Sequence, residues 1–499
     1  MPRPLSLKHS GITLLWIGFG LTLLAWPHEG RTQSPDTLWT RTFGDANIDI
    51  GHCVQQTADE GFIVTGYTRS YGTMSGRNVL LLKLDSSGSI EWHNAFGGEE
   101  DDEGYSVQQT ADGGYIIAGH TLSFGAGGKD VLLIKTDTSG NQDWLQTFGG
   151  PSDDEGYSVQ QSADGGFAVA GVTSSYGAGS RDVWLIKTNA DGLESWSRTH
   201  GGMSSDGAWS AQQTSDSGFI IAGWTFSYGP GYLGNAWLVK TDSLGNHEWN
   251  RAIGGTDVDR AHAVQQTADG GYIIAGYTGS FGAGLYDMLL VKTDPSGNQD
   301  WLQTFGGAGR DYAQAVHQTT DGGYIVGGYT LSYGAGGDDV WLVKTDSDGN
   351  EEWSQTYGGD SSDVAYSVRQ TNDGGYIAAG HTLSYGAGLH DVWLIRLASI
   401  PTGVGEIASR TLFQNYPNPF NPVTTIRFAL SEDCAVRLVI YDVSGRTVRT
   451  LIDANMQAGV HDLRWDGRDN AGGMVAGGIY FYNLQAGTYK TTRKMVFAK

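Results

Sequence analysis

The pattern of polar and hydrophobic positions repeats along most of the chain. It predicts short β-strands and shows no helical period. In the last copy of the repeat, a strand reading AYSVRQT is followed by an NDGG turn, a strand reading YIAAGHT, a loop containing SYG and a strand reading DVWLIRL. Asp-Gly turns between short runs of Val, Ile and aromatic residues are strong hairpin signals. With one further strand built around a tryptophan, each copy is predicted to contain four strands.

The copies align on that tryptophan, which recurs with spacings of 53, 52, 52, 53, 52 and 52 residues. The seven aligned residues are Trp39, Trp92, Trp144, Trp196, Trp249, Trp301 and Trp353. Four short strands repeated at this period indicate radial repetition, since an open solenoid would need polar terminal caps for which the sequence offers no candidate. The predicted fold class is therefore all-β, a seven-bladed β-propeller, with the tryptophans as core anchors.

The phase of the repeat predicts how the ring closes. The chain begins with the tryptophan strand LWTRTF at residues 38–43, whereas the last copy ends with DVWLIRL at residues 391–397. Elsewhere these two strands are joined by a tight hairpin such as DSDGN at residues 346–350. We therefore expect the first strand of the chain to complete the last blade.

The hairpins carry a shared pattern of Asp, two residues, Gly, three residues and Trp, as in DSSGSIEW and DSDGNEEW. This pattern resembles the docking repeat of quinoprotein-like propellers, and the glycine pair after each tryptophan strand is similar to that of kelch repeats. Residues 36–398 as a whole resemble bacterial secreted seven-bladed propeller repeats. The resemblance implies a fold and no quinone cofactor, because adjacent cysteines with a calcium cluster are lacking.

Length and composition narrow the function classes. The 499 residues exceed the usual size of one domain, and 76 Gly, 16 Trp and only 17% charged residues exclude a disordered chain, a coiled coil and collagen. The formal net charge of −23 argues against nucleic acid as a partner, since phosphate binding rests on clustered Lys and Arg.

The first 34 residues are predicted to be an export signal. Arg3 and Lys8 precede the apolar run GITLLWIGFGLTLLAW, which is short for a membrane span, and a polar stretch follows. An uncleaved membrane anchor is the alternative. Cys53 and Cys434 fall in different predicted domains, so a disulfide framework is not expected to hold the chain together.

One aspartate recurs at the same offset in all seven copies. The set is Asp49, Asp102, Asp154, Asp206, Asp259, Asp311 and Asp363. Seven like charges around one axis would repel, so each is expected to accept backbone N–H bonds in its own blade corner rather than to bind cations. A second set is expected to cap turns: Asp130, Asp182, Asp287, Asp339 and Asp391, with Asn78 and Asn235 in the other copies.

Positions that drift between similar copies are better candidates for ligand binding. Aromatic and imidazole groups dominate two such strand positions, and they could stack on sugar rings or other flat ligands if they faced the channel mouth. The candidate ligand-binding residues are His52, Tyr67, His120, Trp209, Trp224, His262, Tyr277, Tyr329 and His381. Packing in the blade core is the alternative. A loop position with variable charge is expected to be exposed to a partner: Arg77, Lys129, Arg181, Tyr286, Asp338 and His390.

Catalysis finds little support in the sequence. The histidines have no metal-ligand spacing, no Gly-x-Ser-x-Gly elbow occurs, and the hairpins depart from the Asp-box of sialidases. Adjacent carboxylates such as Asp101 and Asp102 point apart on a strand. No cofactor or catalytic metal is therefore expected, although the acidic run at residues 99–103 could hold calcium.

Composition changes beyond residue 400. From residue 401 onward the net charge is +3, and short alternating strands separated by Pro and Gly turns predict a small β-sandwich. The segments NYPNPFNP, IYDVSGR, WDGRD and GIYFY, with the basic end RKMVFAK, closely resemble the type A sorting domain of the type IX secretion system and the related FlgD-like immunoglobulin fold. In this resemblance the sorting signal corresponds to Tyr416, Pro417, Asn418, Pro419, Phe420, Asn421, Pro422 and Lys494.

The resemblance implies export across both membranes of a Gram-negative type bacterium, with the type IX secretion machinery as a partner and release or attachment at the cell surface. The predicted domains are a signal at 1–34, a propeller at 35–398, a linker at 399–411 and a sorting domain at 412–499. The leading functional hypothesis is a monomeric, noncatalytic binding propeller for glycan, protein or matrix. A hydrolase or lyase acting on extracellular polysaccharide and a structural surface-layer protein are the alternatives.

Overall fold

The computed structural model describes residues 34–72, 76–400, 410–415, 418 and 420–498. All helix or strand elements in these residues are β-strands, which agrees with the predicted all-β class. No helix suited to crossing a membrane occurs in the described part of the chain. The predicted export signal lies outside the described residues except for Ser34, and residues 401–409 of the predicted linker also lie outside them.

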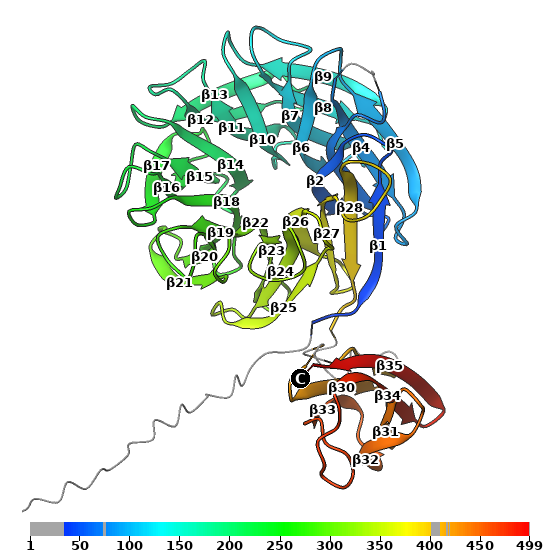
Figure 1. The fold of residues 1–499 in the computed structure, drawn as a ribbon. Helices are drawn as coiled ribbons and strands as arrows, with labels where there is room; N and C mark the ends of the chain where they lie inside the picture. The colour runs from blue at the N-terminus through cyan, green and yellow to red at the C-terminus, as the bar shows by residue number, and fades with distance from the viewer. Residues whose placement is uncertain (1–33, 73–75, 401–409, 416–417, 419, 499) are drawn as a thin grey trace, which may run out of the picture.

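Residues 37–397 form seven four-stranded antiparallel sheets, the blades, arranged around a common axis (Figure 1). Blade 1 contains β2 (Asp49–Gln56), β3 (Phe62–Thr68), β4 (Asn78–Leu84) and β5 (Ile90–Phe96). Blade 2 contains β6 (Asp102–Gln109), β7 (Tyr115–Thr121), β8 (Asp130–Thr136) and β9 (Gln142–Phe148). Blade 3 contains β10 (Asp154–Gln161), β11 (Phe167–Thr173), β12 (Asp182–Thr188) and β13 (Glu194–His200).

The other four blades follow the same plan. Blade 4 contains β14 (Asp206–Gln213), β15 (Phe219–Thr225), β16 (Asn235–Thr241) and β17 (His247–Ile253). Blade 5 contains β18 (Asp259–Gln266), β19 (Tyr272–Thr278), β20 (Asp287–Thr293) and β21 (Gln299–Phe305). Blade 6 contains β22 (Asp311–Gln318), β23 (Tyr324–Thr330), β24 (Asp339–Thr345) and β25 (Glu351–Tyr357). Blade 7 contains β26 (Asp363–Gln370), β27 (Tyr376–Thr382), β28 (Asp391–Leu397) and β1 (Thr37–Phe43).

The predicted closure is confirmed. Strand β1 pairs antiparallel with β28, with Thr42 opposite Trp393, so the first strand of the chain forms the outer edge of the last blade (Figure 1). The ring is also closed at the channel, where the backbone N–H of Asn372 in blade 7 donates to Gln56 Oε1 in blade 1 at 2.8 Å. The seven-bladed propeller expected from the repeat spacing is therefore the observed fold.

Each blade places its first strand at the central channel and its last strand at the rim (Figure 1). The two middle strands, such as β3 and β4, are buried along their whole length because neighbouring blades cover both of their faces. This burial explains why they read as continuous apolar runs. Short turns such as 57–61 and 85–89 lie at one end of the strands, here called the hairpin face. Longer loops and the connections between blades, such as 97–101, lie at the other end, the loop face.

Neighbouring blades are joined by a repeated set of contacts. Gln266, which ends β18, accepts a hydrogen bond from the N–H of Ser215 in the preceding blade at 2.8 Å, and its amide donates to Gly270 O in its own hairpin at 3.3 Å. Gly245, at φ +76°, rests on the Trp196 ring of the preceding blade, and a Cβ there would lie 2.4 Å from the ring. The repeated Asp, Gly and Trp pattern is therefore an inter-blade contact.

The repeated tryptophans lie between blades rather than within one. Trp92 of blade 1 packs edge-on against Tyr115 of blade 2, with ring centroids 5.8 Å apart, and the equivalent pair recurs at each blade boundary. Trp353 is the most deeply buried of the seven, at 1% exposure, and the others are partly buried. Their anchoring role is thus to hold each blade to its neighbour.

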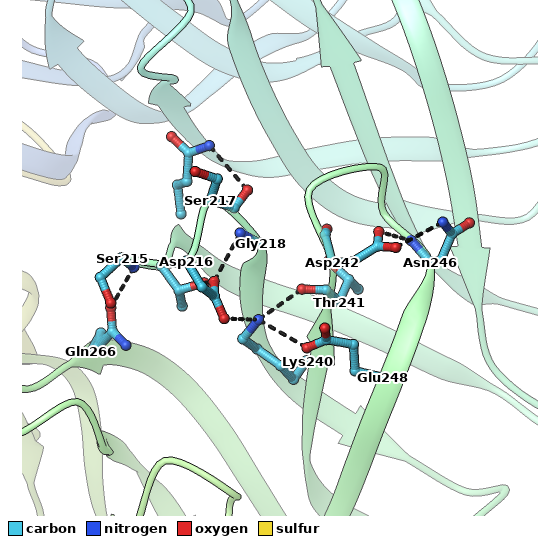
Figure 2. Close-up of polar contacts among 12 residues, drawn as sticks. Ser215, Asp216, Ser217, Gly218, Lys240, Thr241, Asp242, Asn246, Glu248 and Gln266 are labelled. Atoms are coloured by element: carbon cyan, nitrogen blue, oxygen red, sulfur yellow. Dashed lines mark hydrogen bonds and ion pairs between the residues drawn. The ribbon is translucent and has the colours of Figure 1, made fainter.

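A buried cation, a lysine in six blades and Arg396 in the seventh, stabilises the hairpin face of each blade, and sequence reasoning did not single it out. Lys240 is 2% exposed, and its Nζ lies 2.9 Å from Asp216, 3.1 Å from Glu248 and 2.9 Å from the Thr241 carbonyl (Figure 2). The cluster ties the first hairpin of the blade to its last two strands. The corresponding residues of the other blades are Lys83, Lys135, Lys187, Lys292, Lys344 and Arg396.

The C-terminal module is the predicted small β-sandwich. One sheet contains β29 (Thr411–Leu412), β30 (Thr424–Leu430) and β33 (Gly459–Trp465). The other contains β32 (Thr447–Met456), β31 (Cys434–Asp442), β34 (Gly478–Ala486) and β35 (Tyr489–Phe497). Trp465, Tyr482 and Phe428 lie in the core between them. An ion pair between Arg493 and Asp36 joins the module to the segment that leads into β1.

Candidate functional site

The first strand of each blade contains a β-bulge near the loop face, and the bulged residue lines the channel mouth. In β2 the pairing with β3 shifts between Gly51 and Cys53, which leaves His52 unpaired with β3. The seven bulged residues are His52, Tyr105, Tyr157, Trp209, His262, Gln314 and Tyr366. All seven are partly buried. Bulges re-aim side chains, and here the bulge directs a variable residue toward the axis.

The rings at these positions touch around the channel. The ring centroid of His52, in blade 1, lies 5.0 Å from that of Tyr105 in blade 2 and 5.1 Å from that of Tyr366 in blade 7. Tyr105 lies 4.8 Å from Tyr157, and Trp209 lies 4.6 Å from His262. The contacts form two arcs, here together called the aromatic belt. His52 belongs to the arc that runs from Tyr366 to Tyr157, and Trp209 and His262 form the other.

Both imidazoles of this belt are held neutral. The Nδ1 of His52 is 3.0 Å from Gly104 O, and that of His262 is 2.9 Å from Ala313 O, so Nδ1–H donates to a carbonyl in each case. Burial lowers the pKa of His52 and lowers the pKa of His262 to about 4. The mouth is thus lined by uncharged rings at neutral pH.

The other six predicted residues form a second layer behind the belt. Five of them pack against a ring of the first layer, as Trp224 does against Trp209 with centroids 4.2 Å apart, whereas Tyr329 packs against Tyr312. Tyr67 is 8%, His120 2%, Trp224 8% and His381 5% exposed, so these four offer a ligand little surface. Tyr277 and Tyr329 are more exposed. Sequence could not separate the two layers, because both carry the same residue types.

The mouth has a charged half at blades 1 to 3. Arg77 forms an ion pair with Glu103, and Lys129 lies 3.1 Å from Glu155. The two glutamates are only 6% and 7% exposed, and each accepts a hydrogen bond at 2.9 Å from a belt tyrosine. Burial alone would raise the pKa of Glu103, but the hydrogen bond and the positive charge of Arg77 outweigh it and hold that pKa below its usual value.

The opposite half, at blades 5 and 6, is a cluster of four tyrosines. Tyr312 lies 4.5 Å from Tyr277 and 4.9 Å from Tyr329, and Tyr286 lies 5.4 Å from Tyr277. All four are partly buried, and burial raises the pKa of Tyr312 to about 12. Beside them, Arg260 donates to the backbone carbonyls of Asp259 and Leu233, and no ion pair to it is found within the described residues.

Sequence reasoning overlooked Tyr312 and Glu155, and considered Glu103 only as part of the acidic run at residues 99–103 that could hold calcium. They occupy one strand position that reads Ile50, Glu103, Glu155, Gly207, Arg260, Tyr312 and Val364 through the seven copies. Variation between otherwise similar copies indicated the other candidate positions, and the same signal is present at this strand position. At Gly207 the missing side chain makes room for Trp224, since a Cβ there would lie 2.2 Å from that ring. The sizes of the side chains at neighbouring positions of the mouth are therefore complementary, at least in blade 4.

The recurring aspartates are structural, as expected. Asp206 accepts hydrogen bonds from Ser227 Oγ at 2.6 Å and from the N–H of Gly202 at 2.8 Å, and Thr225 donates to its other oxygen. The second set caps turns, as when Asp182 Oδ2 accepts from the N–H groups of Ala178 and Gly179 at 2.7 and 2.9 Å. Neither set is arranged around the channel as a ring of cation ligands.

The described part of the chain brings no three His, Cys, Asp or Glu side chains together in a way that could hold a metal ion. Below the aromatic belt, the channel contains a cavity of about 270 Å³ lined by small and amide side chains from all seven inner strands. Its hairpin-face end carries the same glutamine in five blades, with His317 and Arg369 in the other two.

In the C-terminal module, the described residues of the predicted sorting signal pack against the end of the last strand. Phe420 is 1% exposed and stacks on Phe497 with centroids 4.9 Å apart. Asn418 Oδ1 accepts a hydrogen bond from the N–H of Val496 at 2.7 Å. Lys494 is exposed on β35. Asn421 and Pro422 lead toward β30, whereas Tyr416, Pro417 and Pro419 lie outside the described residues.

Comparisons with known proteins bear on the C-terminal module and on the fold. Residues 421–490 match the model of the FlgD Ig-like domain. This match covers most of the sandwich and agrees with the FlgD-like resemblance. No curated protein matches the sequence significantly.

Solved structures with a similar fold are distant. One is PorZ, described as an essential bacterial surface component of the type IX secretion system of Porphyromonas gingivalis, at 11% identity and a TM-score of 0.45. The match covers 91% of this chain and 60% of PorZ, so the chain spans less than two thirds of that protein. Another is YCF48 bound to the D1 peptide, at 11% identity and a TM-score of 0.43, where the match covers 74% of this chain and 98% of that one. A third is Sqt1 from Chaetomium thermophilum, at 10% identity and a TM-score of 0.41, where the match covers 79% of this chain and 97% of that one. At such scores these likenesses carry no inference about what the chain binds.

Proposed function

We propose that this protein is an exported binding protein whose propeller recognises an extracellular glycan or protein at the loop-face mouth without catalysing a reaction. The observation that carries the proposal is the asymmetry of the mouth. Seven otherwise similar blades place ion pairs at Arg77 and Lys129 on one half and a tyrosine cluster around Tyr312 on the other. Partly exposed rings with few fixed polar groups suit flat or ring-shaped ligand groups.

Recognition without catalysis is favoured by the state of the polar groups at the mouth. A general acid or base needs a pKa tuned toward neutrality, whereas the pKa of Glu103 is held low by Arg77. The Nδ1 of each belt imidazole is committed to a carbonyl, and burial keeps the rings neutral. These groups are suited to holding a ligand in one orientation.

The C-terminal module supports export as the second part of the proposal. Its FlgD Ig-like match at residues 421–490 and its resemblance to type A sorting domains favour the type IX secretion machinery as partner and the cell exterior as destination. Phe420 and Asn418 pack against the end of β35, the strand that carries the exposed Lys494. Lys494 is therefore open to a receptor while the module is folded.

Binding is tested on arrays of extracellular glycans and surface proteins with the secreted protein. Trp209→Ala and Tyr312→Ala are expected to lower the wild-type signal by about tenfold, since each removes a ring that a ligand would stack on. Leu244→Ala is the matched control, because Leu244 is 57% exposed in a turn of the hairpin face. Signals that persist in both mouth variants would refute binding at the mouth.

Export is tested separately by deleting residues 412–499 in a host that has the type IX machinery. The propeller is expected to remain inside the outer membrane, where a protease added outside the cell cannot reach it. A milder variant, Phe420→Ala, removes the contact with Phe497 and should reduce export while leaving the propeller folded. Normal secretion of the deletion variant would refute the sorting role.

A further inference from the structure

Grooves run between neighbouring blades on the outside of the propeller, away from the channel mouth. One of them lies between blades 2 and 3 and has a volume of about 680 Å³. One side is the end of β9, at residues 147–149, and the other is the outer strand β13, at residues 194 and 197–199. A volume of this order is typical of sites that hold small ligands.

Two aromatic residues of blade 3 form the wall and floor of this groove. Tyr176 is 47% exposed, whereas Trp184 beneath it is 5% exposed, and their ring centroids lie 5.3 Å apart. The hydroxyl of Tyr176 donates to Gly149 O of blade 2 at 2.9 Å, which fixes the ring across the blade boundary. A rigid, half-exposed ring is a suitable platform for the apolar face of a sugar.

Polar groups line the rest of the groove. Hydroxyls come from Ser197 and Thr199 on the outer strand, and the carboxylate of Glu194 flanks them. Glu194 and Thr199 are exposed. The Arg198 guanidinium lies over the Trp196 ring, which packs against Phe219 of blade 4, so it faces away from this groove. A ring platform with hydroxyl and carboxylate groups beside it matches a pyranose, which has apolar C–H faces and an equatorial rim of hydroxyl groups.

The same set of residues recurs around the ring. Blade 6 repeats eight of the nine lining positions of the blade 3 groove, with Gln355 in place of Arg198: Thr304, Phe305, Gly306, Tyr333, Trp341, Glu351, Ser354 and Thr356. Tyr333 lies 5.1 Å from Trp341 and donates to Gly306 O at 2.8 Å, as in blade 3. In blade 7, Tyr385 pairs with Trp393 at 5.4 Å and donates to Gly358 O at 2.8 Å.

Blades 2 and 5 carry a different, apolar version. Their loop aromatics are Phe124 and Phe281, and leucines, Leu132 and Leu289, replace the tryptophans. The blade 5 groove has a volume of about 340 Å³, and Leu302 lines it where blade 3 has Ser197. In these two blades the loop ring and the floor residue thus change together. Blade 4 keeps the aromatic pair, since Tyr228 stacks on Trp237 at 5.3 Å and donates to Gly201 O at 3.2 Å, but it has Asn250 and Ala252 where blade 3 has Ser197 and Thr199.

We propose that the outer grooves that combine a Tyr–Trp pair with two hydroxyl residues on the outer strand, in blades 3, 6 and 7, are subsites for pyranose units of a polysaccharide. These sites are separate from the channel mouth and go beyond the function proposed for it. Several equivalent weak sites on one rigid ring give a long chain with repeated units a much higher avidity than any one site has for a single unit.

The test is calorimetric titration of the secreted full-length protein with five hexasaccharides: cellohexaose, xylohexaose, mannohexaose, laminarihexaose and chitohexaose. At least one of them is expected to bind. A triple variant with Tyr176→Ala, Tyr333→Ala and Tyr385→Ala is expected to weaken that binding by about tenfold or more. The double variant Phe124→Ala and Phe281→Ala is the matched control and should bind as the wild type does.

Two further variants separate the possible causes of a loss. If the triple variant melts at a lower temperature, Glu194→Gln with Thr199→Val, both exposed, should still remove the blade 3 site and lower the stoichiometry. Tyr312→Ala changes only the mouth and should leave hexasaccharide binding intact, so failure at the mouth and failure in the grooves can be told apart. Absence of binding to all five sugars, or unchanged binding by the tyrosine variants, would overturn the proposal.

Discussion

The two ends of the central channel are built from the same seven strands, yet they differ in how uniform they are. Toward the hairpin face, the strands repeat one glutamine whose side chain accepts a hydrogen bond from the next blade, as Gln212 does from the N–H of Gln266 at 2.6 Å. The repeated residues are Gln55, Gln108, Gln160, Gln212 and Gln265. Toward the loop face, the bulged position carries His, Tyr, Trp or Gln.

The difference separates what the fold needs from what a ligand could use. A closed ring forms only if each blade makes the same contacts with its neighbours. Identical side chains at equivalent positions provide those contacts. The Gln contacts, the buried lysines and the Gly–Trp contacts are of this kind. Variation at the mouth breaks the sevenfold symmetry, and only a mouth without that symmetry can fix the orientation of a ligand.

The largest effect is expected from the uniform scaffold. Trp353→Ala should lower the free energy of unfolding by about 3–5 kcal/mol, because the ring is 1% exposed and packs against Tyr376 of the next blade. Thermal and urea denaturation measure the change. A loss below about 1 kcal/mol would show that the inter-blade rings are not the anchors described here.

The lysine cluster offers a second test at the hairpin face. Lys240→Ala is expected to cost about 2 kcal/mol, because it leaves a cavity and removes the hydrogen bond to the Thr241 carbonyl. Lys240→Met keeps most of the volume and is the matched variant, with a smaller expected loss. Urea unfolding of the pair reports the difference. Equal losses in both variants would mean that volume is not what the lysine contributes.

The turn-capping aspartates predict how stability depends on pH. Burial, with the nearby Asp363 and Asp338 carboxylates, raises the pKa of Asp339 to about 6, above its ordinary value of 3.8. The folded state therefore binds this proton more tightly, so the stabilisation is complete below pH 3.8 and is lost as the pH rises through 6.

Asp339→Asn should consequently raise the melting temperature at pH 8 by about 2–4 °C and change it little at pH 4. Asn78 and Asn235 already occupy this position in two blades, so the amide fits the turn. Calorimetry at the two pH values gives the comparison. An equal shift at both would contradict the assigned pKa.

At the mouth, a substitution is expected to weaken ligand binding with little effect on stability. Tyr312→Ala is expected to change the free energy of unfolding by only about 1 kcal/mol, since the ring is partly exposed, while it weakens ligand binding about tenfold. Denaturation and the array signal are measured on the same preparation. A large loss of stability with unchanged binding would assign Tyr312 to the scaffold.

The smallest effect concerns the pH dependence of binding. Because burial lowers the pKa of His262 to about 4 and that of His381 to about 3, neither imidazole changes charge between pH 5 and 8. Affinity at the mouth is expected to be constant over this range, when followed by titration of the array ligand. A step near pH 6.5 would show that one of these histidines is charged when the ligand is bound.

Much of the fold could be predicted from the sequence, because a closed ring of equal blades requires a regular spacing between the copies of the repeat. The recurrence of Trp39 and its six equivalents predicted seven blades, and the phase of the first strand predicted its pairing with β28. The site was less accessible. A bulge shifts the register at Gly51 and its equivalents, so strand alternation did not show that His52 faces the channel while Tyr67 lies behind it. Tyr312 was not predicted because its strand position is Ile50 in blade 1, Glu103 in blade 2 and Arg260 in blade 5, so the position has no common chemistry that would indicate a binding role.

The most direct test of the account is a crystal structure of the secreted protein with the ligand that the arrays select. The account predicts ligand density at the loop-face mouth, in contact with Trp209 of the belt and Tyr312 of the tyrosine cluster. Density confined to the hairpin face, where the repeats are uniform, would contradict the claim that variation between blades marks the site of function.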